Sequence, residues 1–130
     1  IAHRTSDKVK ISTHVPDSLP LVRLNVALFE WVIENLCKNA VDAMGGVGVL
    51  VISVQETSRY WCIDVADTGK GIDKRYFETV FVPGYTTKKR GWGLGLSLAR
   101  RIVVEYHSGS IFVKQSEINK GTIFRIELKK

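Results

Sequence analysis

The stretch Asp67-Thr68-Gly69-Lys70-Gly71-Ile72 directly follows an apolar run, residues 60–66, that is rich in β-branched and aromatic residues. Such a run is typical of a buried strand, and a carboxylate at its end can point toward a ligand. The two glycines would let the backbone approach a flat ligand closely. The same letters are also typical of a simple turn. Both interpretations predict a strand that ends in a tight glycine loop.

Hydrophobic periodicity predicts the elements on either side of this stretch. Apolar residues with helical spacing follow Asn25, a suitable N-cap, and stop at Gly45 and Gly46. Helical spacing returns over 94–106 and ends at Gly109. A weak helix is expected over 74–79. Strands are expected over 9–13, 49–54, 60–66, 111–114 and 122–128.

Composition places limits on the class of protein. A length of 130 residues is common for one domain, and 45% hydrophobic with 25% charged residues is ordinary for a soluble globular domain. No apolar run approaches the roughly 18 residues of a membrane span, and the N-terminus does not look like a signal peptide. Cys37 and Cys62 are too few for a disulfide framework or metal cluster, which favours a reducing cytoplasm.

The charge balance is basic, with a formal net charge of +6. A basic chain could bind nucleic acid, but Lys and Arg are scattered and the only dense run is 88–90. An anionic small ligand or an acidic protein partner would suit that run equally well.

Polar residues recur on one face of the helix expected after Asn25. Asn35, Asn39 and Asp42 are spaced four and then three residues apart, so they project from the same side, with Lys38 beside them. An amide oxygen is a neutral, hard ligand that suits Mg²⁺. Asn35 and Asn39 could therefore hold this ion, or the face could simply meet solvent.

A second glycine-rich stretch, Gly91-Trp92-Gly93-Leu94-Gly95-Leu96-Ser97, leads straight into the later helix. Its backbone amides and the helix N-terminus would form an anion site beside Lys88, Lys89 and Arg90. The stretch is not a Walker loop, which needs a Lys followed by Ser or Thr after its last glycine. It is not a dinucleotide fingerprint either, because position 96 is Leu and no strand precedes it. Phosphate is the expected ligand.

Taken together and in this order, the patterns resemble the GHKL nucleotide-binding family, which includes histidine kinases, gyrase, certain chaperones and mismatch-repair ATPases. The resemblance extends from about residue 29 to 124. It rests on an N box (Asn35-Leu36-Cys37-Lys38-Asn39-Ala40), a G1 box (67–72), an F box (77–81), a G2 box (91–96) and a closing Gly121-Thr122-Ile123-Phe124. It implies an α+β fold, the Bergerat fold: a two-layer α/β sandwich whose mixed sheet of about five strands carries about three helices on one face.

The resemblance also implies ATP and Mg²⁺ as ligands and a role for each motif. Asn39 would be the main Mg²⁺ ligand with Asn35 beside it, and Asp67 would accept a hydrogen bond from the adenine amino group. Thr122 would support Asp67 directly or through water. The other residues expected at the nucleotide are Lys38, Gly69, Gly71, Ile72, Thr86, Thr87, Lys88, Gly91, Trp92, Gly93, Leu94, Gly95 and Leu96. Ile72 and Leu96 could instead be core residues, and Lys88 a solvated loop charge.

The residue type at position 35 distinguishes the ATPases of this family from its histidine kinases. Gyrase-like ATPases carry a general-base Glu four residues before the Mg²⁺ Asn, and an amide in that place cannot take a proton from water. Glu34 is one residue away, about 100° around the helix, so it should point off the site. Histidine kinases commonly have Asn here because their nucleophile is a histidine on another domain. Asp42 and Ala43 depart from many sensor kinases, whereas Thr86-Thr87-Lys88 resembles a subgroup with a short lid.

The resemblance to histidine kinases implies partners that the chain does not contain. None of His3, His14 and His107 lies in an acceptor-like helical context, so the phosphoacceptor is expected on a dimerisation helical domain before residue 1. Residues 1–8 would end that connection and 9–130 would form the catalytic domain. A response regulator receiver domain would be an indirect partner. Nucleic-acid and membrane contacts are not expected, and the location would be the cytoplasm, whether or not the full-length protein is membrane-anchored. The alternatives are a GHKL regulatory module, an anti-sigma-like serine kinase or a GHKL ATPase.

Overall fold

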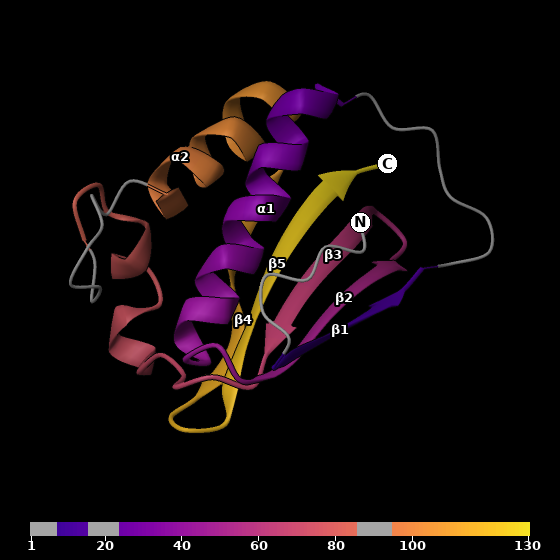
Figure 1. Ribbon diagram of the computed structural model, residues 1–130. Helices are drawn as coiled ribbons and strands as arrows, with labels where there is room; N and C mark the ends of the chain where they lie inside the picture. Colours follow the sequence, from indigo (N-terminus) through magenta and orange to yellow (C-terminus); the bar gives the residue numbers. More distant parts are fainter. Residues whose placement is uncertain (1–7, 16–23, 86–94) are drawn as a thin grey trace.

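The computed structural model describes residues 8–15, 24–85 and 95–130 (Figure 1). The described strands are β1 (Val9–His14), β2 (Gly48–Glu56), β3 (Tyr60–Asp67), β4 (Ser110–Glu117) and β5 (Gly121–Lys129). The described helices are α1 (Val26–Ala43) and α2 (Gly95–Arg101), together with the short 3-10 helices η1 (Lys74–Tyr76) and η2 (Thr79–Phe81) and the π-helix η3 (Ile102–Tyr106).

The strands form one mixed sheet in the order β1-β2-β3-β5-β4. Only the β1–β2 pair is parallel, and the other three neighbouring pairs are antiparallel. Helices α1 and α2 lie side by side over one face of the sheet (Figure 1). The expected two-layer α+β sandwich is therefore confirmed, and each expected strand is present.

Helix α1 forms because its sequence provides both a cap and an apolar stripe. The Asn25 side chain accepts a hydrogen bond from the Leu28 amide, which satisfies one of the free donors of the first turn. The buried stripe Phe29, Val32, Leu36 and Ala40 then packs on the sheet. The helix ends where Gly45 and Gly46 take positive φ angles, as expected from the sequence.

The core lies between the two layers, because alternate residues of each strand face the helices. On β5 these residues include Phe124, Ile126 and Leu128, each less than a tenth exposed. The Phe81 ring meets the Phe124 ring edge-on at 6.1 Å, which attaches η2 to the sheet. The opposite face of the sheet holds a partly buried ion pair, in which Arg125 donates to both carboxylate oxygens of the buried Asp64 at 2.7 and 2.9 Å.

The weak helix expected over 74–79 is present only as two separate 3-10 helices, η1 and η2. Their amides bond three residues back, from Tyr76 to Asp73 and from Phe81 to Glu78. A run this short gains little from α-helical propagation. The Asp73 side chain also accepts from the Arg75 amide, which favours a short turn over a longer helix.

The helix expected over 94–106 is present from Gly95 onward, but its final turns are π-helical. The wider turns bring the His107 ring over Ile102, whose carbonyl oxygen lies 3.1 Å from Nδ1. Nε2 of the same ring accepts a hydrogen bond from the Asn25 amide at 3.0 Å, and the ring meets Phe29 edge-on. His107 thus joins the end of η3 to the start of α1.

Candidate functional site

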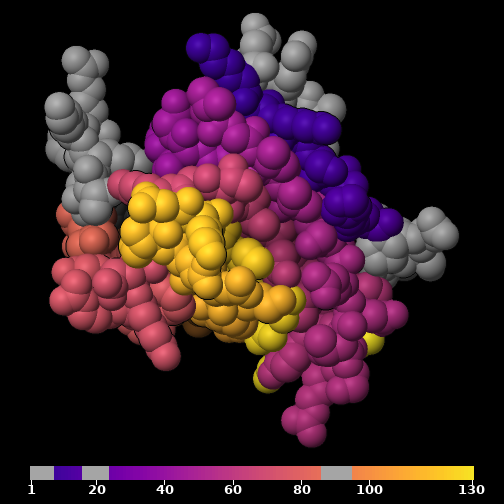
Figure 2. Space-filling view, turned by 90° about the horizontal axis from the view of Figure 1, so that it is seen from below, coloured from indigo at the N-terminus to yellow at the C-terminus, as the bar shows by residue number. Residues whose placement is uncertain are grey.

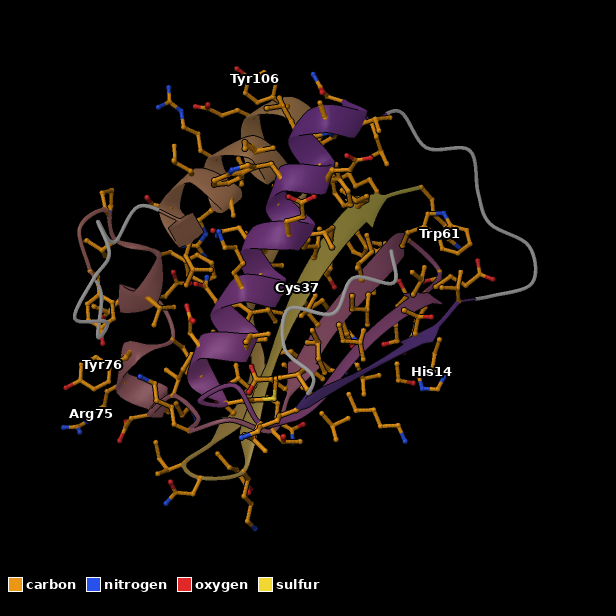
Figure 3. All side chains as sticks on the ribbon, in the orientation of Figure 1. His14, Cys37, Trp61, Arg75, Tyr76 and Tyr106 are labelled. Carbon is orange, nitrogen blue, oxygen red and sulfur yellow. The ribbon has the colours of Figure 1, made fainter. Side chains whose placement is uncertain are left out.

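The two asparagines of α1 lie on the face that turns toward α2. Asn35 and Asn39 are both half-buried, whereas Lys38 and Glu34 are exposed. The exposure of Glu34 agrees with the expectation that it points away from the site. Cys37, on the same helix over the sheet (Figure 3), packs partly against the core, and burial raises the pKa of its thiol.

Asn35 makes an unusually close approach to the start of α2. A Cβ atom added to Gly95 would lie 2.7 Å from Oδ1 and 2.8 Å from Nδ2 of Asn35. The Nδ2 atom is buried and has no hydrogen-bond partner within residues 8–15, 24–85 and 95–130. A buried donor of this kind calls for an acceptor, and an anionic oxygen of a bound ligand would provide one.

Asp67 lies at the end of β3 and is 8% exposed. Its Oδ1 accepts a hydrogen bond from the Gly69 amide at 2.8 Å. Burial raises the pKa of the carboxyl, and hydrogen bonds from the backbone of Gly69 and Thr122 act in the opposite direction. The site therefore contains a buried acceptor that two backbone groups hold in place.

The loop after Asp67 is fixed by backbone bonds on both sides. The backbone amide of Lys70 donates to the Ala43 carbonyl at 2.9 Å, and the backbone amide of Asn119 donates to the Lys70 carbonyl at 2.8 Å. Gly71 has φ +79°, and a side chain there would collide with the Glu117 carbonyl. Figure 2 shows the yellow β4–β5 turn lying against the pink chain that follows β3. The glycines of this stretch thus serve both a turn and a close backbone approach.

One functional candidate, Ser116 on β4, was missed by the sequence analysis. Its Oγ accepts a hydrogen bond from the Ile72 amide at 2.7 Å and lies 2.7 Å from Oγ1 of Thr122. Thr122 is buried and pairs directly with Asp67 across β5 and β3. The only signal in the sequence was a serine just before the closing glycine motif, which is too common to single out.

The expected F box contributes to the packing between α2 and the sheet. Val80 and Phe81 are buried, and Arg100 of α2 places its guanidinium 4.0 Å from the centre of the Phe81 ring. The same guanidinium donates to Glu78 at 2.8 Å. Arg75 and Tyr76 lie at the outer edge of η1 (Figure 3), with both side chains exposed. This segment therefore braces α2 against the sheet.

Several expected site residues lie outside the described part of the chain: Thr86, Thr87, Lys88, Gly91, Trp92, Gly93 and Leu94. The structure brings Asn35 together with Gly95, and Asp67 together with Gly69 and Thr122. Ile72 and Leu96 are half-buried and pack against the core, which agrees with the core alternative for both.

The residues present fit a magnesium ion bound together with a phosphate group. Mg²⁺ prefers oxygen ligands and usually keeps waters and nucleotide phosphates in its shell. Asn35 and Asn39, one turn apart, offer amide oxygens, and the Nδ2 atom of Asn35, which has no partner among the described residues, suits a phosphate oxygen. Within the described ranges, no group of three or more His, Cys, Asp or Glu residues is placed to hold a metal.

The chain belongs to the family described as histidine kinase-, DNA gyrase B-, and HSP90-like ATPases, whose pattern matches residues 25–130. Within this family its relatives include sensor histidine kinases. It is 35% identical over 123 residues to the sensor histidine kinase ZraS of Escherichia coli K12, covering 95% of this chain and 26% of that protein. It is 37% identical over 94 residues to sporulation kinase C of Bacillus subtilis, covering 72% and 22%. The chain thus spans about a quarter of the length of these curated relatives.

Solved histidine kinase structures share the fold. A nucleotide-free structure of the catalytic domain of the histidine kinase ThkA has a TM-score of 0.80 and 30% identity, covering 95% of this chain and 81% of that one. ThkA in complex with the response regulator protein TrrA has a TM-score of 0.76 and 28% identity, covering 94% and 34%. Across the described ranges, no helix has the length and apolar character to cross a membrane.

Proposed function

We propose that this chain is the catalytic part of a two-component sensor histidine kinase, which binds ATP with Mg²⁺ and supplies the γ-phosphoryl group to a histidine on a separate domain. The observation that carries the proposal is the pairing of Asn35 with Gly95, which leaves a buried amide donor facing the start of α2. The family assignment and the kinase relatives support it.

The adenine end of the nucleotide is assigned to the edge of the sheet where β3 ends. The Asp67 carboxylate is buried, and its remaining lone pairs can accept the base amino group. Gly69 and Gly71 let the loop beside it pass closely along the backbones of Ala43 and Glu117. Ile72 and Leu96 would border the base with their apolar surfaces, since both are only partly covered by the core.

The phosphate end is assigned to the place where Asn35 of α1 meets the start of α2. Asn39, with Asn35 beside it, would hold Mg²⁺, and Lys38 would lie at the rim. The ion would neutralise charge on the phosphates as the transferred group leaves ADP. The expected phosphate contacts from Lys88 and the 91–95 amides remain part of the proposal.

Asn35 favours transfer to a histidine over transfer to water. Its amide has no basic lone pair with which to deprotonate water, and Glu34 on the neighbouring face is exposed. An imidazole nitrogen needs no such base, because its lone pair can attack phosphorus directly. The new bond is N–P, the broken bond joins the γ-phosphorus to its bridging oxygen, and ADP leaves.

The partners follow from this chemistry. The acceptor histidine is assigned to a helical dimerisation domain of the same full-length kinase, and residues 1–8 to the end of the connection. A response regulator receiver domain would take the phosphoryl group from that histidine. The relative ThkA has been seen in complex with the response regulator TrrA, which supports this route. A cytoplasmic location for the domain is part of the proposal.

The test is a labelled-phosphate assay on the isolated chain, with and without its separately produced acceptor domain. We expect label on the acceptor domain and negligible free phosphate from the chain alone. An acceptor domain with its histidine changed to glutamine controls for labelling elsewhere. Rapid ATP hydrolysis without any partner would move the chain to the ATPases of the family, and label on serine would move it to the serine kinases.

A further inference from the structure

The Ser116 hydroxyl is the centre of three short contacts beside the proposed base site. It accepts from the Ile72 amide at 2.7 Å and lies 3.0 Å from the Gly121 carbonyl oxygen and 2.7 Å from the Thr122 hydroxyl. These partners come from the loop after β3 and from the start of β5. One side chain on β4 therefore links the two segments that border Asp67.

The direction of each bond follows from counting protons. A serine hydroxyl has one proton to donate and two lone pairs to accept with. The Gly121 carbonyl can only accept, so the Ser116 proton must point to it; otherwise two oxygens would face each other at 3.0 Å with no proton between them. The Ile72 amide uses one lone pair of Ser116. The second lone pair is left for the Thr122 hydroxyl, which must be the donor in that contact.

The orientation of Thr122 has a consequence for the site. Once its proton points to Ser116, its hydroxyl oxygen can act toward a ligand only as an acceptor. Thr122 is 3% exposed and is the cross-strand partner of Asp67, with both side chains on the helix-facing side of the sheet. The carboxylate and the hydroxyl together thus form a pair of acceptors with no free proton.

We propose that Ser116 is a positioning residue that makes the site select adenine over guanine. The inference rests on the proposed assignment of the base to Asp67. Adenine presents an amino group, a donor, where guanine presents the O6 acceptor. A Thr122 hydroxyl that could rotate would donate to O6 and reduce the mismatch. Because Ser116 accepts the Thr122 hydroxyl proton, the guanine O6 atom would face only acceptors.

The experiment measures dissociation constants for ATP and GTP, each with Mg²⁺, by calorimetry on the wild type and Ser116→Ala. The ratio of the two constants is the readout, because a purely structural role would weaken both nucleotides alike. We expect the wild type to prefer ATP and Ser116→Ala to lose about fivefold of that preference, the value of one net hydrogen bond. Ser116→Thr, which keeps the hydroxyl, should restore the ratio.

The chain offers a matched control on the same strand. Ser110 has the same residue type at the other end of β4, and its hydroxyl makes only a 3.5 Å contact to Glu127. Ser110→Ala should therefore leave the ATP to GTP ratio unchanged. Thermal unfolding of each variant shows whether it is folded before its ratio is compared.

A second pair of variants keeps the inference testable if Ser116→Ala does not fold. Thr122→Val removes the hydroxyl, so it should lower ATP affinity with little effect on GTP, whereas Thr122→Ser should keep the wild-type ratio. A folded Ser116→Ala with the wild-type ratio, or a Thr122→Val that weakens both nucleotides equally, would overturn the role of Ser116. A wild type that binds ATP and GTP equally would instead overturn the assignment of Asp67.

Discussion

Gly95, the first residue of α2, lies so close to Asn35 of α1 that a Cβ atom added to it would be 2.7 Å from the Asn35 Oδ1. These two residues are 60 positions apart in the sequence, and their contact brings the N-box helix against the start of the second helix. Asn35 also carries a buried Nδ2 atom without a partner in the described part of the chain. The position of this amide is therefore sensitive to any added atom at Gly95.

The first prediction is that Gly95→Ala weakens Mg²⁺-ATP binding by tenfold or more, because the methyl group must displace either the Asn35 amide or the start of α2. Calorimetry with ATP and Mg²⁺ would measure this. A matched control is Leu98→Ala, a change at an exposed position of the same helix, which should bind like the wild type. If Gly95→Ala binds like the wild type, the contact with Asn35 has no role in nucleotide binding.

The second prediction is that Asn39→Ala abolishes Mg²⁺-dependent ATP binding and leaves the fold intact. The change removes an amide oxygen from a half-buried position but no apolar group from the core. Circular dichroism and calorimetry with and without Mg²⁺ would separate the two effects. Glu34→Ala, an exposed change on the same helix, should bind normally. Unchanged Mg²⁺-dependent affinity in Asn39→Ala would contradict the metal assignment.

The third prediction concerns pH. Burial raises the pKa of Asp67 above its usual value of 3.8, so the folded chain binds this proton more tightly than the unfolded chain does. The contribution of Asp67 to stability is therefore greatest below about 3.8 and falls as the pH rises through the raised pKa. Denaturant unfolding at a series of pH values should show this slope in the wild type and not in Asp67→Asn.

Protonation of Asp67 should weaken ATP binding, whereas it favours the stability of the fold. The charged carboxylate is the better acceptor for the adenine amino group, so affinity should rise as the pH rises through the raised pKa of Asp67. Asp67→Asn should bind ATP weakly at every pH, since its amide can present a donor to the base. If the variant keeps wild-type affinity at neutral pH, Asp67 does not hold the base.

The fourth prediction compares two adjacent arginines of α2. Arg100 bonds to Glu78 and to the Ile111 carbonyl, and its guanidinium stacks on Phe81. Arg100→Ala should lower the free energy of unfolding by about 1–2 kcal/mol, since it removes a cation–π contact and a bond to a partly buried carbonyl. Among the described residues, Arg101 pairs with the exposed Glu105 one turn away, so Arg101→Ala should cause no measurable change. Equal losses in chemical denaturation would contradict the bracing role of Arg100.

Much of the fold could be predicted because its signals are local. The cap at Asn25, the apolar stripe of α1 and the alternation in β5 each act over a few residues, and each appears where it was expected. The weak helix expected over 74–79 is two short 3-10 helices, because a segment this short takes its form from its surroundings. Here the Asp73 cap and the contact of Phe81 with Phe124 favour the tighter turns.

The sequence by itself determined the residue types of the candidate site and their order. It placed Asp67 at the end of a strand before glycines, and Asn35 with Asn39 on one helix face, because strand and helix periodicity fix the direction of neighbouring side chains. The tertiary structure alone decided which of these residues meet. Sheet register puts Thr122 opposite Asp67, and helix packing puts Gly95 against Asn35. Ser116 contacts Ile72 and Thr122, which lie 44 and 6 positions away from it in the sequence. Contacts of this kind depend on how strands and helices are assembled, and no local pattern in the chain specifies that assembly.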